Sequence, residues 1–418
     1  IIIIIIIIII TSHYHLRVHL KLSIVLRRDL PVRHVTMHSP PASSSSQKGG
    51  AYGLGSHNPL VVQVVVAILC GVIFGVAIEK GRVFEPEVIV AQMKFQSFAM
   101  MKMFLSAVGT SQVLLGLLSL TPFYQPTLTE IQDYNKGPLN GRGLAATVAG
   151  GALLGMGMTL AGACPGTVLV QLGTGVSSAL AVLLGGLVGA LLYALCEPYL
   201  RANFLPIADI KVEKKLLPQM LNTKYHLVAL PLGAMMWLVV LALESFFPWK
   251  SQVSIPLLDS PSFPSLSAPA WPPYVAGMVV GSLQIPLSLG LGKTLGSATS
   301  YSVCVHNACY LVAPDACHRS TYIMSVKDGL RLWWQVIYVC CAILGGFLSS
   351  HWSGTFGSGS PLPLVTSFFG GVCLLFGSRL AGGCTSGHGI SGMSMGSLWA
   401  FAAVGAMFAG GMGLALIL

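Results

Sequence analysis

Long apolar stretches separated by short polar segments follow one another along the chain from about residue 60 onward. Apolar runs long enough to cross a hydrocarbon core of about 30 Å lie at nine places: 60–78, 100–120, 144–163, 177–196, 227–247, 274–291, 330–350, 364–383 and 398–418. A tenth stretch, 297–313, is shorter and contains His306 and Asn307. Because polar groups persist at membrane depth only inside protein or beside water, we expect it to form a buried or re-entrant helix.

The composition agrees with this pattern. Hydrophobic residues make up 54% of the chain and charged residues 9%, whereas soluble globular proteins carry roughly 25% charged residues. We therefore predict an all-α polytopic membrane protein with about nine transmembrane helices, whose surroundings are the lipid bilayer. A large soluble enzyme and a disordered chain are excluded, and no nucleic-acid partner is expected.

The first 58 residues differ from the rest. They open with ten isoleucines and contain no methionine before Met37, where we expect the protein to start. A signal peptide places its basic region before its apolar stretch, and here the order is reversed. Six basic residues and Asp29 within 1–48 together supply +5 of the net charge of +10, so we do not interpret the net charge as a sign of a nucleic-acid partner. We interpret 1–58 as a disordered or artefactual N-terminal tail.

An internal repeat links two distant segments. G-G-A-L-L-G-M-G-M-T-L-A-G-A-C at 150–164 matches G-G-V-C-L-L-F-G-S-R-L-A-G-G-C at 370–384 without a gap, with eight of the fifteen positions identical. Gly71-x3-Gly75 and Gly277-x3-Gly281 are candidate openings of the two halves. An odd number of spans separates a position in the first copy from the equivalent position in the second. The second copy therefore has the opposite orientation in the membrane. Inverted repeats of this kind are typical of transporters.

The repeat divides the chain into three parts after the tail. A first transmembrane repeat is expected at 59–200, a connecting span with its loops at 201–270, and a second, inverted repeat at 271–418. Lys and Arg in the loops number twelve on one side and five on the other. Cytoplasmic loops carry the excess of Lys and Arg, so we expect a plasma-membrane protein with a cytoplasmic N-terminus. Glu244, at the end of its span, is expected to be solvated.

Each repeated cysteine lies where an apolar span gives way to a Gly-rich polar stretch. The stretches after Cys164 and Cys384 are too short and polar to cross a membrane. We expect each to be a break followed by a short helix, and Pro165 fits because proline is tolerated in a first helical turn. Such a helix directs unpaired N–H groups and the positive end of its dipole at the cysteine. Two of them would make an anion site.

The paired motifs, above all G-S-R-L-A-G-G-C-T-S-G-H-G-I-S-G at 377–392, resemble the YeeE/YedE family of sulphur-compound transporters, over roughly residues 59–418. The resemblance implies that the substrate is thiosulfate or a related small sulphur anion. It implies that Cys164 and Cys384 lie at the repeat interface and pass the anion along by S–H hydrogen bonds. Bacterial members use a further cysteine near the first hairpin, but residues 79–85 contain none here. This departure puts a three-step relay in doubt.

Further candidate substrate-binding residues flank the two cysteines: Pro165, Gly166, Thr167, Arg379, Thr385, Ser386, Gly387 and His388. Arg379 lies in an otherwise uncharged span, and an intramembrane arginine is functional by default; the alternative is that it caps backbone carbonyls. His388 either donates to an anion or caps the break.

No cofactor or metal is expected. Cys304, Cys309 and Cys317 lie near His306 and His318, but their spacings match no zinc signature. The alternative function is a membrane-embedded, thiol-dependent sulfurtransferase with Cys384 as its nucleophile. That reaction needs a general base beside the thiol, and the sequence offers only His388. We therefore favour a transporter over an enzyme.

Overall fold

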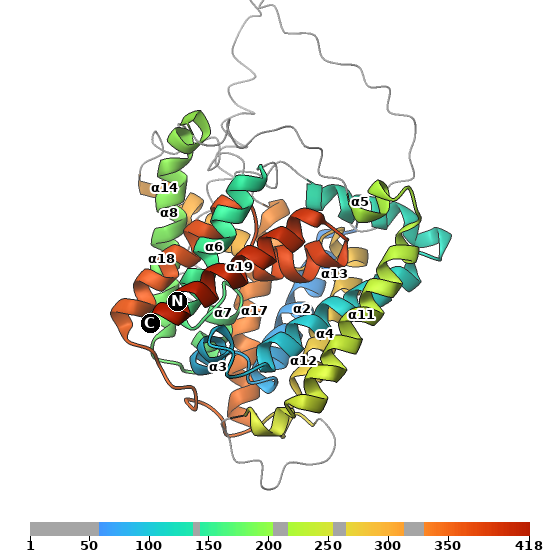
Figure 1. The fold of residues 1–418 in the computed structure, drawn as a ribbon. Helices are drawn as coiled ribbons and strands as arrows, with labels where there is room; N and C mark the ends of the chain where they lie inside the picture. The colour runs from blue at the N-terminus through green and yellow to red at the C-terminus, as the bar shows by residue number, and fades with distance from the viewer. Residues whose placement is uncertain (1–57, 137–142, 204–215, 254–264, 313–329) are drawn as a thin grey trace, which may run out of the picture. The chain divides into compact units, whose positions relative to one another are not determined.

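Helices make up most of the residues that the computed structural model describes (Figure 1). The structure describes residues 58–136, 143–203, 216–253, 265–312 and 330–418. In these residues no β-strand forms, and one isolated bridge joins Leu216 to Ser397. The tail predicted at 1–58 lies outside the described residues, apart from Asn58.

Nine helical spans in the described residues are long and apolar enough to cross a membrane. They are α2 (Leu60–Lys80), α4 (Ala99–Leu118), α6 (Leu144–Ala161), α8 (Ala179–Asn203), α11 (Tyr225–Phe246), α12 with α13 (Pro273–Ser282 and Gln284–Leu291), α17 (Leu330–Trp352), α18 (Leu364–Ala381) and α19 (Leu398–Ile417). Each predicted span falls on one of them, so the predicted fold class is confirmed. The chain is an integral, multi-pass membrane protein.

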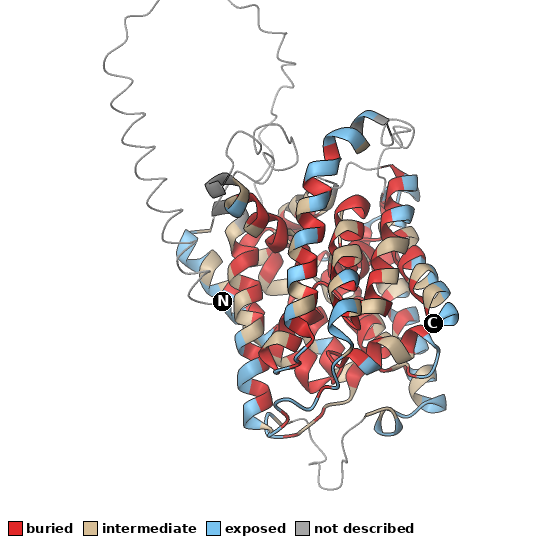
Figure 2. Ribbon diagram, turned by 90° about the vertical axis from the view of Figure 1, so that its left-hand side faces the viewer, coloured by how far each residue is buried: buried red, intermediate tan, exposed pale blue. Residues whose placement is uncertain are grey.

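Large apolar side chains on the outward faces of these helices are exposed. Figure 2 shows buried residues on the inward sides and exposed residues along the periphery. Val61, Leu238 and Phe246 are 72%, 65% and 78% exposed. In water such surfaces would cost free energy in proportion to their area, but against lipid chains they cost little. The outward faces are therefore the lipid-facing surface.

Shorter helices connect the spans. They are α3 (Pro86–Met93), η1 (Pro122–Tyr124), α5 (Gln125–Lys136), α7 (Thr167–Gly173), α10 (Leu217–Met220), η3 (Trp249–Ser251), α14 (Ala298–Val312) and the π-helical η4 (Thr385–Gly392). Helix α14 is the tenth apolar stretch of the sequence. Ala298, Tyr301 and Ser302 in it are each less than 5% exposed, as expected of a buried helix.

Helices α6 and α18, which carry the repeated motif, pack closely against each other, with α19 beside α6 (Figure 1). A Cβ atom added to Gly157 would lie 2.5 Å from the backbone nitrogen of Leu374. A Cβ atom added to Gly377 would lie 2.5 Å from the backbone nitrogen of Leu154. These two contacts are equivalent under the offset of 220 residues, so each copy of the motif makes the same contact with the other.

The other helix pairs show the same reciprocity. Helix α2 packs on α17 and α12 packs on α4, while α8 packs on α18 and α19 packs on α6. Gly75 and Gly281, from the two predicted openings, approach the backbone oxygens of Ala342 and Ala107. Helix α11, the predicted connecting span between the two copies, packs on α4. Two copies related by a two-fold axis would pack in this way, which supports the predicted inverted repeat.

Candidate functional site

The segment around Cys164 is held by hydrogen bonds between Cys164 and Thr167. Gly162, in the left-handed region at φ +56°, ends α6, and α7 begins at Thr167. The backbone N–H of Cys164 donates to Thr167 Oγ1 at 2.6 Å, and the backbone N–H of Thr167 lies 3.4 Å from Cys164 Sγ. The Gly166 backbone N–H also faces this sulphur atom. The predicted break followed by a short helix is present here.

The segment around Cys384 begins in the same way but continues differently. Gly382, at φ +82°, ends α18, and the next helix begins at Thr385. This helix, η4, is π-helical and contains glycines at 387, 389 and 392. Ser386 Oγ lies 3.2 Å from Cys384 Sγ, and the Gly387 backbone N–H faces the same atom.

The first turn of α14 contacts both cysteine segments. Ser297, the residue before α14, places its Oγ 4.0 Å from Cys384 Sγ, and the backbone N–H groups of Ser297 and Ala298 also face this sulphur atom. A Cβ atom added to Gly166 would lie 3.4 Å from Ser297 Oγ. The hydroxyl of Tyr301 donates to the Pro165 carbonyl oxygen at 3.0 Å. The two cysteine segments thus meet at one helix end, with the sulphur atom of Cys384 beside it.

This helix end favours negative charge. Helix α14 has fifteen residues, and its first turn contains no acidic side chain. Unpaired N–H groups and the dipole give a helix N-terminus a partial positive charge. A sulphur-containing anion beside Cys384 would therefore meet donors from α14, Ser386 and Gly387. Ser297 and Tyr301 were not among the predicted site residues, although hydroxyl side chains gather at 297–302.

Thr385, Arg379 and His388 fasten the end of α18 to its neighbours. Thr385 Oγ1 donates to Met158 Sδ at 3.7 Å. Arg379 is 7% exposed and donates to Ser302 Oγ on α14 at 3.1 Å and to Ser378 Oγ at 3.3 Å. His388 Nε2 lies 3.2 Å from the Ala381 carbonyl oxygen. The His388 contact matches the capping role considered above, whereas these two contacts of Arg379 are to hydroxyl groups rather than to backbone carbonyls. The part of all three residues in substrate binding stays a prediction.

Metal ligands do not gather at this site. In the described part of the chain, no group of three or more His, Cys, Asp and Glu residues could hold a metal ion. Cys317 and His318 lie outside the described residues.

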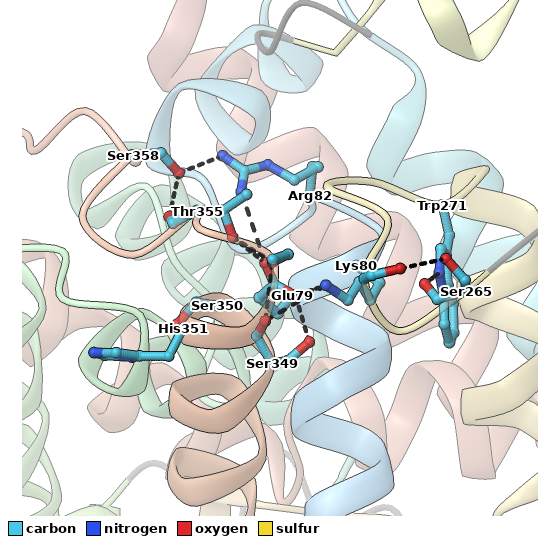
Figure 3. Close-up of polar contacts among 12 residues, drawn as sticks. Glu79, Lys80, Arg82, Ser265, Trp271, Ser349, Ser350, His351, Thr355 and Ser358 are labelled. Carbon is cyan, nitrogen blue, oxygen red and sulfur yellow. Dashed lines mark hydrogen bonds and ion pairs between the residues drawn. The ribbon is translucent and has the colours of Figure 1, made fainter. Parts of the chain in front are cut away.

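Residues 79–85, which contain no cysteine, form a buried ionic cluster (Figure 3). We call Glu79, Lys80, Arg82 and Glu85 the Glu79 cluster; each is at most 3% exposed. Lys80 Nζ and Arg82 Nη1 lie 3.3 and 3.8 Å from carboxylate oxygens of Glu79, and Arg82 also pairs with Glu85. The two basic and two acidic side chains balance in charge, as groups buried this deeply must.

Hydroxyl groups complete the cluster and connect it to the other half of the chain. Ser349 Oγ on α17 donates to Glu79 at 2.6 Å, and Thr355 Oγ1 donates to its second oxygen at 2.7 Å. Gln171 on α7 donates to the carbonyl oxygens of Phe84 and Gly162. The cluster is thereby coupled to the Cys164 segment.

A model of the family described as Sulphur transport matches residues 80–413. The chain belongs to this family. It is 23% identical over 344 residues to the thiosulfate transporter TsuA of Escherichia coli (strain K12), covering 78% of this chain and 86% of the relative. It is 22% identical over 354 residues to the thiosulfate transporter TsuA of Spirochaeta thermophila (strain ATCC 700085 / DSM 6578 / Z-1203), covering 78% and 90%.

Membership of the sulphur-transport family confirms the resemblance seen in the motifs around Cys164 and Cys384. It identifies the chain as a transporter rather than an enzyme. The same membership argues against the alternative of a sulfurtransferase with Cys384 as its nucleophile.

Proposed function

We propose that this sulphur-transport protein carries thiosulfate across the plasma membrane. The observation that carries the proposal is the arrangement of Cys164 and Cys384, from equivalent positions of the repeat, around the first turn of α14. The names of the two relatives support thiosulfate as the particular substrate. The path lies where the two repeats meet, because the motif helices α6 and α18 pack against each other there.

The donors around Cys384 suit a weakly held dianion. Ser386 and the backbone N–H groups of Ser297, Ala298 and Gly387 are neutral, and a thiol is a weak donor. Transport requires binding that is favourable enough for entry and weak enough for release. The thiols of Cys384 and Cys164 therefore act in succession as S–H donors to the substrate, with Arg379, His388, Thr385 and Thr167 holding their segments in place.

Uptake of radiolabelled thiosulfate into proteoliposomes tests the proposal. We expect saturable uptake. Unlabelled thiosulfate should suppress the uptake of the label, sulfate should not, and sulfite should suppress it to an intermediate extent. Cys384→Ala should reduce uptake to the level of empty liposomes. Cys340→Ala and Cys373→Ala are matched controls, since these partly exposed cysteines of α17 and α18 lie away from the helix breaks, and both should retain uptake. Equal loss in all variants would indicate a folding defect and contradict the relay.

The relay is non-covalent, so Cys384 should gain no sulphur atom during transport. Intact-mass analysis after thiosulfate exposure is expected to show the unmodified protein, with thiosulfate emerging unchanged. A stoichiometric sulphur adduct on Cys384, together with sulfite in the medium, would overturn the relay in favour of sulphur transfer.

A further inference from the structure

Three neighbouring side chains near the start of α17 bury polar atoms without satisfying them. Trp334, Gln335 and Tyr338 are 5%, 2% and 1% exposed. Trp334 Nε1, Gln335 Oε1 and the Tyr338 hydroxyl have no hydrogen-bond partner among the described residues. Most buried polar groups in proteins are hydrogen-bonded, so each exception needs an explanation. Their spacing puts all three on one side of the helix.

This side of α17 lies next to both cysteine segments. The Tyr338 ring packs on Phe74 with ring centroids 5.5 Å apart, and a Cβ atom added to Gly166 would lie 3.4 Å from the Phe74 ring. The Gln335 carboxamide nitrogen would lie 3.6 Å from a Cβ atom added to Gly296, the residue before Ser297.

The two aromatic side chains contact each other. The rings of Trp334 and Tyr338 meet edge to face at 6.2 Å. Both side chains, like Cys164 and Cys384, lie in the large hydrophobic core of the described residues.

We propose that Tyr338 and Trp334 form a second wall of the substrate path, which donates hydrogen bonds to the oxygen atoms of the anion. This inference rests on the proposed function and names residues that set its specificity. Thiosulfate has oxygen atoms at one end and a soft sulphur atom at the other. The thiols of Cys164 and Cys384 suit the sulphur end, while O–H and indole N–H groups suit the oxygen end. An anion in the path satisfies donors that the protein leaves without a partner.

Tyr338→Phe tests the wall, because it removes one oxygen atom and keeps the ring that packs on Phe74. Uptake at low thiosulfate concentration should fall about tenfold or more, as expected when a hydrogen bond to a charged group is lost. The melting temperature in detergent should stay unchanged or rise, because the hydroxyl removed has no protein partner to lose. Trp334→Phe should show the same combination.

Tyr193→Phe is the matched control. Tyr193 is a fully buried tyrosine of α8 that packs on Phe376, and its variant should transport like the unmodified protein. Full uptake by Tyr338→Phe would overturn the inference and leave the proposed function standing. A lower melting temperature in Tyr338→Phe than in the unmodified protein would also overturn it, since the hydroxyl would then be structural. Absence of thiosulfate uptake by the unmodified protein would instead refute the proposed function.

Discussion

Two glycines determine where the motif cysteines lie. Gly162 and Gly382 end α6 and α18 in the left-handed conformation, at φ +56° and +82°. Glycine is favoured at this position after a helix because it adopts positive φ without steric cost. Each cysteine follows its glycine by two residues, so the chain leaves the helix before the thiol and turns it toward backbone N–H groups. The repeated A-G-x-C therefore encodes a geometry as well as a thiol.

The Glu79 cluster carries a prediction at this scale. Glu79→Gln keeps the shape of the side chain but leaves Lys80 and Arg82 buried with one carboxylate fewer. Removing one partner of a buried ion pair costs about 3–5 kcal/mol, so the variant should unfold at a clearly lower temperature in detergent. Glu87→Gln, at an exposed position of the adjacent helix α3, should leave the unfolding temperature unchanged. Equal behaviour of the two variants would show that the ion pairs contribute no stability.

Pairings between distant residues were beyond the reach of the sequence. Glu244, expected to be solvated, accepts from Lys102 Nζ at 2.7 Å, and its side chain is 24% exposed. The carboxylate is therefore partly solvated, and the sequence did not reveal its ion pair because Lys102 lies on another helix. Ser297 and Tyr338 were missed for the same reason: their partners lie far away in the chain, and only the packing of α14 and α17 brings them to the cysteines.

At the scale of elements, the sequence predicted more. Each of the nine spans is fixed by a local run of apolar residues, and so was the buried helix α14. The division of one span into α12 and α13 follows from Pro286, which cannot donate the backbone hydrogen bond that a continuous helix needs. The π-helical form of η4 was not foreseen, because glycine-rich sequences permit several backbone forms and the surrounding packing selects one of them.

The crossing of α6 and α18 depends on small residues. Gly157→Ala would bring a methyl group within 2.5 Å of the Leu374 backbone nitrogen, so the helices must move apart. Overpacking of this kind lowers the free energy of unfolding by about 1–3 kcal/mol. Uptake should fall as well, because the two cysteine segments directly follow the ends of α6 and α18 and would move with them. Gly377→Ala makes the equivalent contact with Leu154 and should have a similar effect. Thermal unfolding in detergent and uptake into proteoliposomes measure the two consequences.

Gly405→Ala on α19 is the control for the crossing. No atom lies within 4 Å of a Cβ added there, and alanine favours helix over glycine by about 0.5–1 kcal/mol. This variant should be at least as stable as the unmodified protein and should transport normally. If Gly157→Ala behaved in the same way, the close contact between α6 and α18 would be contradicted.

At the scale of the whole molecule, the reciprocal helix contacts and the span count make one joint prediction. An odd number of spans would place the two ends of the chain on opposite sides of the membrane, and the excess of Lys and Arg in one set of loops predicts a cytoplasmic N-terminus. The C-terminus, after α19, should then lie outside. The same inversion sets α6 and α18 antiparallel, which the paired contacts of Gly157 and Gly377 require.

Reporter fusions test this topology. Alkaline phosphatase, active only outside the cytoplasm, should be active when fused after Leu418 and inactive when fused within 204–215. Green fluorescent protein, which fluoresces in the cytoplasm, should give the opposite result at both places. A third fusion within 254–264, after α11, should give the same result as the C-terminal fusion. The single span α11 separates it from the loop at 204–215, so it should lie on the other side of the membrane. A fluorescent C-terminal fusion without phosphatase activity would require an even number of crossings. The second repeat would then have the same orientation as the first, and a shared anion path between Cys164 and Cys384 would lose its symmetry.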